Sequence, residues 1–349
     1  MKESSHNEFE HGDAYSRNSQ SYGKIMDFSA SIAFKKDTKK LELDIEDLKH
    51  YPVASDEMKK LIGNVSGFNP DNITPGYGLT SLIYAIYKIY SCGRVLFAEP
   101  IFSEHRRSAS IEKMSISRIP IKIILSEPKM IRNYSPDIVS INSPINPTGE
   151  YVRYENIERI LEILSESGGY LFLDEAFIDF VPFSIRGNTQ KLIEKYSNLI
   201  IGRSFSKISG LAGIRLGYTI SSVDIARKIE NNMEPWTIPQ YYSRILPELL
   251  TSATDPDALS RERNYVIERL IRSGCAILGR PDANYISFRL PENINGNTFR
   301  EKLLRKGFLI RSISNFYGFE ESDFRIAILD RESDQKLMEA IDREIKNGR

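Results

Sequence analysis

Three polar residues that could do chemistry lie at or just after the ends of short apolar runs. They are Asn146, Asp174 and Lys207. Each interval between them is long enough for one strand, helix, strand crossover, and the carboxyl ends of parallel strands meet at one edge of a sheet. We therefore expect the amide, the carboxylate and the amine to lie together at one edge of the sheet. An amine beside a carboxylate could act as a nucleophile, although such pairs also occur as structural ion pairs.

A second group of residues could hold a phosphate. Gly76 and Gly78 stand directly before a predicted helix, and the N–H groups of Leu79 and Thr80 in its first turn would face an anion. Further donors to the same anion would come from Ser204, Ser206 and Arg215. An isolated Gly-x-Gly also shapes ordinary tight turns, and the chain has neither a P-loop nor a complete Gly-x-Gly-x-x-Gly motif.

A lysine, a carboxylate, an amide and phosphate donors around one pocket match the needs of pyridoxal 5'-phosphate. The lysine would form a Schiff base with this cofactor, and the carboxylate would keep the pyridine nitrogen protonated so that the ring accepts electrons. A metal site is not expected, because Cys92 and Cys275 are far apart and no Cys-x-x-Cys or His cluster accompanies them.

The elements that must position these residues alternate between helical periodicity and apolar runs. Helices are expected at 56–65, 79–90 and 154–167. Buried strands are expected at 94–99, 137–142, 170–175, 199–204 and 214–221. After Pro239 a long helical region is followed by strand-like segments at 284–290, 308–314 and 324–329. This order predicts an α/β fold, with a large domain built on a mostly parallel sheet flanked by helices and a smaller α+β domain.

Composition narrows the classes of partner. The 349 residues include 47 Lys plus Arg and 47 Asp plus Glu, so the formal charges balance. No overall electrostatic field therefore favours binding to nucleic acid or to an acidic membrane. Mean hydropathy is −0.34, and neither a signal peptide nor a long apolar span is visible. We therefore expect a cytoplasmic protein with a small-molecule ligand.

Three motifs resemble those of the class I/II aminotransferase family, fold type I of the pyridoxal-phosphate enzymes. They are SPINPTG, LFLDEAFIDF and RSFSKISGLAGIRLGY. The resemblance covers nearly the whole chain and implies that Lys207 forms the Schiff base, Asp174 pairs with the pyridine nitrogen and Asn146 donates to the ring hydroxyl. It further implies a large cofactor-binding domain at 46–240 and a small domain made of 1–45 and 241–349.

The resemblance also assigns residues around the cofactor and the substrate. Phe102 would stack on the ring, Tyr51 would reach the phosphate of the neighbouring subunit in a homodimer, and Arg325 would grip the anionic end of the substrate. The phosphate would be held by Gly78, Leu79, Thr80, Ser204, Ser206 and Arg215. Departures from the family pattern occur at Phe177, where a tyrosine is common, and at Val53, Tyr77 and Ser81.

Within the family, the chain resembles most the branch of histidinol-phosphate aminotransferase and the threonine-phosphate decarboxylase of cobalamin biosynthesis. Three segments favour the decarboxylase: EHGDA, MDFSASI and FLIRSISNFYGF. His11, Arg311 and Arg325 are the candidates for gripping a phosphate or carboxylate of a phosphorylated amino acid or amine. Transamination stays open as the alternative reaction, and a binding protein without turnover stays open as another class.

Overall fold

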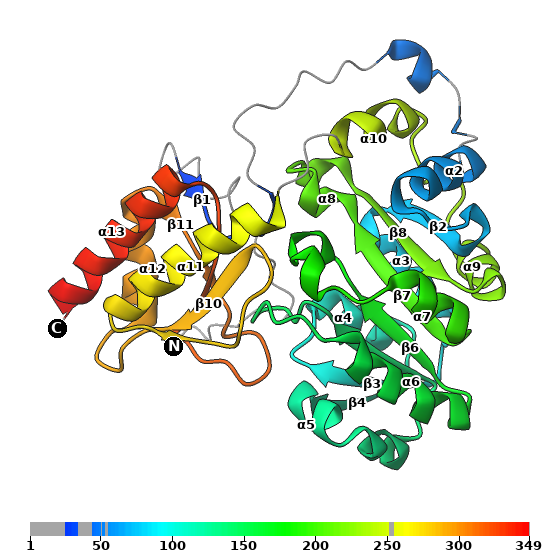
Figure 1. Ribbon diagram of the computed structural model, residues 1–349, viewed down its shortest axis with the longest axis horizontal. Helices are drawn as coiled ribbons and strands as arrows, with labels where there is room; N and C mark the ends of the chain where they lie inside the picture. The colour runs from blue at the N-terminus through cyan, green and yellow to red at the C-terminus, as the bar shows by residue number, and fades with distance from the viewer. Residues whose placement is uncertain (1–24, 34–43, 50, 53–54, 251–254, 349) are drawn as a thin grey trace.

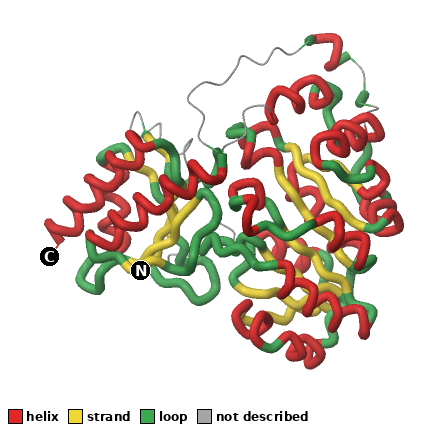
Figure 2. Tube along the Cα trace, in the orientation of Figure 1, coloured by secondary structure: helices red, strands yellow, loops and turns green. Residues whose placement is uncertain are grey.

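The computed structural model describes residues 25–33, 44–49, 51–52, 55–250 and 255–348. The chain forms a large sheet flanked by helices and a smaller unit that carries the C-terminal helices (Figure 1). Figure 2 shows that strands occupy the middle of both units and helices their outside. The expected α/β fold with a smaller α+β part is confirmed.

Within the described residues, the large sheet has seven strands in the order β2-β8-β7-β6-β5-β3-β4. Only β8 runs antiparallel to its neighbours, so the sheet is mostly parallel as predicted. The strands are β2 (Ile73–Tyr77), β3 (Arg94–Glu99), β4 (Ser115–Pro120), β5 (Ile138–Asn142), β6 (Tyr170–Asp174), β7 (Leu199–Ser204) and β8 (Leu216–Ser221). The parallel strands direct their carboxyl ends to one edge, where ligands of such sheets bind.

Both faces of this sheet are covered, which explains why its central strands read as continuous apolar runs. In β3, Val95 and Phe97 pack into one hydrophobic cluster, whereas Leu96 and Ala98 pack into the other. The first cluster includes side chains of α3 (Gly78–Ile89), α4 (Ser103–Ile111) and α9 (Val223–Glu230). The second includes side chains of α2 (Ser55–Ser66), α5 (Ile121–Ser126), α6 (Tyr154–Ser167), α7 (Thr189–Lys195), α8 (Phe205–Ile208) and α10 (Tyr242–Leu250).

The smaller unit is built on an antiparallel sheet in the order β12-β13-β10-β9. Its strands are β9 (Ala276–Ile277), β10 (Tyr285–Arg289), β12 (Arg311–Ser312) and β13 (Asp323–Ala327). Its helices are α11 (Pro256–Arg272), α12 (Gly296–Arg305) and α13 (Arg331–Gly348). The segment 308–314, expected as one strand, is divided, because β11 (Phe308–Leu309) pairs with β1 (Met26–Asp27) and β12 pairs with β13.

Residues 26–33, which we call the crossing segment, join the two units. In β1, Met26 pairs in parallel register with Phe308. At the other end of the segment, the Ala33 N–H donates to the Lys207 carbonyl over 2.8 Å. The crossing segment therefore connects the small unit directly to the backbone of the predicted catalytic lysine. The division of the chain into domains stays a prediction.

No helix in the part of the chain that the structure describes has the length and apolar character needed to cross a membrane.

Candidate active site

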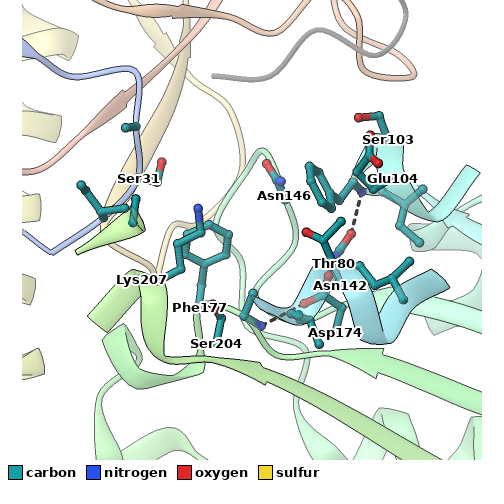
Figure 3. Close-up of a pocket in the computed structure, with 18 of the residues that line it drawn as sticks. Ser31, Thr80, Ser103, Glu104, Asn142, Asn146, Asp174, Phe177, Ser204 and Lys207 are labelled. Carbon is teal, nitrogen blue, oxygen red and sulfur yellow. Dashed lines mark hydrogen bonds between the residues drawn. The ribbon is translucent and has the colours of Figure 1, made fainter. Parts of the chain in front are cut away.

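A cavity of about 420 Å³ opens at the carboxyl ends of the large-sheet strands, next to the small unit. Residues from β5, β6 and β7, from α3 and α4, and from the crossing segment line it together with side chains of β12 and β13. The sequence-predicted residues that line it are Leu79, Thr80, Phe102, Asn146, Asp174, Ser204, Lys207, Arg215, Arg311 and Arg325. Figure 3 shows Lys207, Asn146 and Asp174 reaching this cavity from different elements.

Asp174 ends β6 and is held by three donors. Its Oδ2 accepts from Asn142 Nδ2 over 2.8 Å and lies 3.0 Å from His105 Nε2, while its Oδ1 accepts from the Ala176 N–H over 3.0 Å. Strand register places Asn142 directly opposite Asp174, so the amide comes from the neighbouring strand end. This carboxylate is only 4% exposed, so the three donors hold it in place inside the site.

Behind Asp174, a buried hydrogen-bonded chain fixes the orientation of His105. His105 Nδ1 lies 2.9 Å from the Tyr87 hydroxyl, which lies 2.7 Å from Ser140 Oγ. With a neutral imidazole that donates from Nε2 to the carboxylate, Nδ1 would accept from the Tyr87 hydroxyl, which would in turn accept from Ser140. Burial raises the pKa of Tyr87, which keeps its hydroxyl protonated as this direction requires.

Lys207 lies in α8, the short helix that follows β7, and its side chain reaches the cavity beside Phe177. Its Nζ lies 5.4 Å from the centroid of the Phe177 ring. Phe177 has no hydroxyl and packs edge-on against Tyr285, with ring centroids 4.9 Å apart. The amine therefore faces an apolar ring at the position where the family resemblance leads one to expect a phenol.

Gly78 and Arg215 meet at the first turn of α3. Gly78 has a φ of +67°, and a Cβ added there would come within 2.6 Å of Arg215 Nη2. Arg215 itself has a φ of 49°, and its carbonyl accepts a hydrogen bond from the Tyr242 hydroxyl over 3.2 Å. A side chain at position 78 would thus displace the Arg215 guanidinium. The glycine therefore allows the guanidinium to lie close to the backbone, and it also permits the left-handed backbone conformation.

We expect Gly78→Ala to weaken cofactor binding, because the new methyl group must push Arg215 away from the predicted phosphate site. The Kd for pyridoxal phosphate, measured by fluorescence titration of the apoprotein, should rise by about tenfold or more. Gly213→Ala is the matched control, because a Cβ at position 213 meets nothing within 4 Å. Equal affinities of Gly78→Ala and the wild type would contradict the assigned phosphate site.

Asn146 and the two predicted substrate arginines form one group at the border with the small unit. Arg325 Nη1 donates to Asn146 Oδ1 over 2.8 Å, and its Nη2 donates to the Ser29 carbonyl over 3.2 Å. Arg311 and Arg325 are direct partners in the register of β12 and β13, and both are buried. Within the described residues, the polar partners of Arg325 are neutral, its Nε has none, and burial lowers its pKa.

Among the described residues, Gly78, Ser206 and Tyr51 do not line the cavity, although Gly78 adjoins Arg215, which does. Ser206 Oγ accepts from the Leu216 N–H over 3.3 Å and so braces the start of β8 instead of lining the cavity. Tyr51 is 76% exposed and packs against Trp236, with ring centroids 5.0 Å apart. His11, like the departure noted at Val53, lies outside the described residues. The roles assigned to these side chains remain predictions.

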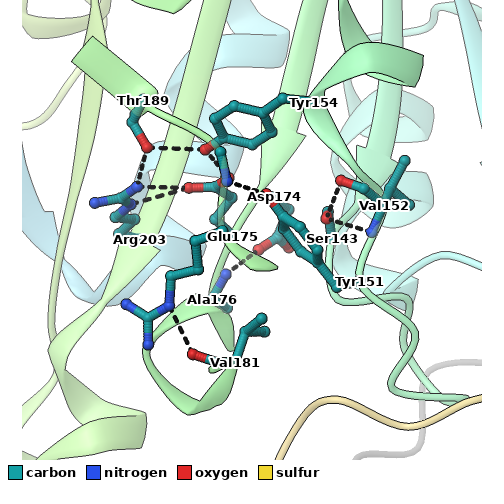
Figure 4. A network of polar contacts seen from close by, with 12 residues as sticks. Ser143, Tyr151, Val152, Tyr154, Asp174, Glu175, Ala176, Val181, Thr189 and Arg203 are labelled. Atoms are coloured by element: carbon teal, nitrogen blue, oxygen red, sulfur yellow. Dashed lines mark hydrogen bonds and ion pairs between the residues drawn. The ribbon is translucent and has the colours of Figure 1, made fainter. Parts of the chain in front are cut away.

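A second buried network surrounds Glu175, the residue that follows Asp174 (Figure 4). Glu175, next to Asp174, accepts from the Tyr154 hydroxyl over 2.6 Å and from Arg203 Nη2 over 2.8 Å. Arg203 Nη2 also donates to Thr189 Oγ1 over 2.8 Å. Glu175 is fully buried, and its carboxylate is hydrogen-bonded within this network. The network therefore fixes the backbone next to Asp174 without involving the Asp174 carboxylate.

The residues present fit pyridoxal phosphate. The cavity offers a buried acceptor for a protonated ring nitrogen at Asp174, an amine at Lys207, and a glycine cradle beside Arg215 for a phosphate. Among the described residues, no group of three His, Cys, Asp or Glu side chains could hold a metal ion.

Sequence reasoning missed Asn142 and His105. Asn142 ends the apolar run of β5, and the same strand-end rule that selected Asp174 could have selected it. His105 lies in α4 three residues after Phe102, the residue that precedes this helix, and the two ring centroids are 6.5 Å apart. Its contact with Asp174 depends on how α4 packs on the sheet, which no local pattern indicates.

Comparison with known proteins agrees with this geometry. The family model for aminotransferase class I and II matches residues 26–341. Histidinol-phosphate aminotransferase 2 of Archaeoglobus fulgidus is 32% identical over 298 residues, which cover 83% of each chain. A solved histidinol-phosphate aminotransferase from Clostridium acetobutylicum has a TM-score of 0.77 at 28% identity, covering 87% of this chain and 92% of its own.

The fold is also shared with a decarboxylase of known structure. L-threonine-O-3-phosphate decarboxylase from Porphyromonas gingivalis has a TM-score of 0.78 at 21% identity, covering 87% of this chain and 93% of its own. At this identity the likeness shows the fold alone. The match over most of the chain, together with the lysine, carboxylate and phosphate cradle, places the protein in the class I and II aminotransferase family of pyridoxal-phosphate-dependent enzymes.

Proposed function

We propose that this enzyme acts on a phosphorylated amino acid and that its reaction is the decarboxylation of L-threonine O-phosphate. The observation that carries the proposal is the cross-strand pair Arg311 and Arg325, both lining the cavity that holds Lys207. Two guanidinium groups that line one cavity match a substrate with two anionic groups.

An α-amino acid that carries a phosphate monoester has two such groups. Arg325 is held by Asn146 and the Ser29 carbonyl, both at the cavity, and would bind the carboxylate with its fork of N–H donors. Arg311, whose Nη2 donates to Asn315 Oδ1 over 3.2 Å, would bind the phosphate. The sequence segments at 26–32 and 308–319, which resemble those of the decarboxylase, lie at this border.

The chain's own residues would then direct the reaction. When bound, pyridoxal phosphate supplies an electron sink for the bond broken at Cα. Asp174, held in place by Asn142 and His105, would accept a hydrogen bond from the protonated ring nitrogen. The arginine pair would orient the Cα bond to be broken by holding the anionic groups of the substrate, and Lys207 would deliver the proton that replaces the lost carboxylate. Phe177 offers no hydroxyl to share that proton.

Transamination of histidinol phosphate is the second candidate. The 32% identity to the Archaeoglobus fulgidus aminotransferase favours it, and the same arginine pair could bind both carboxylates of a glutamate amino donor. Membership of the family makes the protein an enzyme, so a binding protein without turnover is set aside.

A decarboxylase of this kind would supply aminopropanol phosphate for cobalamin biosynthesis in the cytoplasm.

Product analysis decides between the two reactions. Purified enzyme loaded with pyridoxal phosphate is incubated with L-threonine O-phosphate, and released carbon dioxide and aminopropanol phosphate are measured. A parallel assay supplies the ketone of histidinol phosphate with glutamate and measures histidinol phosphate. Carbon dioxide release that is faster than amino transfer supports the proposal, whereas amino transfer without carbon dioxide release contradicts it and assigns the transaminase.

We also propose that the enzyme works as a homodimer that shares its two sites. Tyr51 and Trp236 form an exposed aromatic pair away from the cavity of their own subunit, as expected of residues that serve a partner. Analytical ultracentrifugation should show a dimer, and Tyr51→Ala should raise the Kd for pyridoxal phosphate. A fully active monomer at assay concentration would contradict the shared site.

A further inference from the structure

The loop between β12 and β13, residues 313–322, brings side chains of the small unit to the cavity. Asn315 and Phe316 both line the cavity. Asn315 Oδ1 accepts from Arg311 Nη2 over 3.2 Å, so the loop also contacts one of the two predicted substrate arginines. We call this segment the β12–β13 loop. Its position decides where these side chains stand when a substrate enters.

Tyr317 joins the β12–β13 loop to the large unit. The Phe319 N–H donates to the Phe316 carbonyl over 3.3 Å, which puts Tyr317 at the corner of a turn. The guanidinium of Arg118 lies over the Tyr317 ring, with Cζ 4.8 Å from the ring centroid. A guanidinium at this distance is attracted by the face of an aromatic ring. The contact therefore links the loop to β4, the edge strand that carries Arg118.

Arg118 is itself held by a buried carboxylate of the large unit. Its register partner in β3 is Phe97, and Glu99 stands two residues further along β3, on the same face of the sheet. Arg118 Nε donates to Glu99 Oε1 over 2.7 Å, and the Glu99 side chain is only 1% exposed. Glu99 Oε2 accepts from the N–H of Ile101, which lines the cavity. The guanidinium is therefore anchored to the cavity wall.

The two units are also joined at the segment that follows β5. The Tyr285 hydroxyl donates to the Ile145 carbonyl over 3.2 Å, and Ser287 Oγ donates to the Pro147 carbonyl over 2.6 Å. Both donors belong to β10, so these bonds hold the small sheet itself. Arg118 instead contacts the β12–β13 loop. Loss of this contact should change the position of the loop and leave the two units together.

We propose that Arg118 is a positioning residue for substrate binding, which acts by holding Tyr317 and with it the β12–β13 loop at the cavity. Arg118 and Tyr317 do not line the cavity themselves, so they act through Asn315 and Phe316. The inference rests on the proposed function in one respect, namely that Arg311 binds the substrate. It predicts a change in KM with kcat retained, because the loop carries neither the amine nor the carboxylate of the reaction.

A double-mutant cycle tests the contact. KM and kcat are measured for Arg118→Met, Tyr317→Leu and the double variant, all loaded with cofactor, on the substrate that the product analysis identifies. Each single variant should raise KM by about two- to fivefold and change kcat by less than about twofold. In the Arg118→Met background, Tyr317→Leu should add almost nothing. An equal effect of Tyr317→Leu in both backgrounds, or none in either, overturns the proposal.

Two further variants separate this contact from simple packing. Tyr317→Phe keeps the aromatic face and should have the KM of the wild type. Arg94→Met is the matched control, because Arg94 begins β3 at the other end of the strand, where it pairs with Asp137 over 3.4 Å. Its KM should also be unchanged. If Arg118→Met does not fold, the comparison of Tyr317→Phe with Tyr317→Leu decides, and equal rises in KM overturn the proposal.

Failure of the proposed function would give a different result. In that case the cofactor-loaded wild type turns over neither candidate substrate, and hydrogen exchange measured by mass spectrometry tests the loop without any substrate. Amides of residues 313–319 should exchange faster in Tyr317→Leu than in the wild type or Tyr317→Phe, because the loop has lost its anchor. Unchanged exchange in Tyr317→Leu would overturn the role of Arg118 whatever the reaction.

Discussion

Lys207→Ala should abolish both turnover and covalent attachment of pyridoxal phosphate. Lys207 supplies the amine that lines the cavity, and its loss removes both the nucleophile and the group that moves the proton at Cα. We expect the rate to fall by roughly 10³-fold or more. Borohydride reduction followed by mass spectrometry should find the cofactor on Lys207 of the wild type and on no residue of the variant.

The fold of this variant should survive, because the hydrogen bond that ties Lys207 to Ala33 uses the backbone carbonyl. Circular dichroism and the Tm should therefore stay close to those of the wild type. Lys191→Ala, on the exposed face of α7, is the matched control and should keep full activity. Cofactor trapped by borohydride on Lys207→Ala would refute the assignment of this lysine.

Asp174→Ala should retain some cofactor but lose most of its activity. Without the carboxylate, the pyridine nitrogen loses its charged partner, and a neutral ring is a poor electron sink. The donors Asn142 and His105 would also be left facing a gap in a buried site. We expect kcat to fall by roughly 10²- to 10⁴-fold, measured at saturating cofactor.

Two further variants separate the charge from the packing. Asp174→Asn keeps the shape but places an amide opposite the donors of Asn142 and His105, so it should be almost as inactive as Asp174→Ala. Asp224→Ala, at an exposed position in α9, should behave like the wild type. A rate near that of the wild type in Asp174→Ala would mean that another group holds the ring nitrogen.

The sequence predicted the central strands of the large sheet because they are buried on both faces. Such strands read as unbroken apolar runs, as in residues 94–99 and 199–204. The edge strands escaped prediction. β2 contains Pro75 and Gly76, which suit an edge but resemble a turn, and β4 is half exposed and polar. The ends of the central strands were enough to locate Asn146, Asp174 and Lys207.

Contacts between distant segments could not be predicted in the same way. The register that sets Arg311 opposite Arg325 depends on how two short strands of the small unit pair. The contact of His105 with Asp174 depends on the packing of α4 against the sheet. Neither relation leaves a periodic pattern in the chain, because both arise from tertiary packing and not from local preference.

The crossing segment also sets the order in which the site can be completed during synthesis. Met26 leaves the ribosome early, but its strand partner Phe308 is made only when most of the chain has been translated. The large sheet has all of its strands by Ser221 and can begin to form first. Until β11 emerges, the end of the crossing segment away from Lys207 lacks its strand partner. A nascent chain would therefore carry the lysine, the carboxylate and the phosphate cradle before it could hold any substrate.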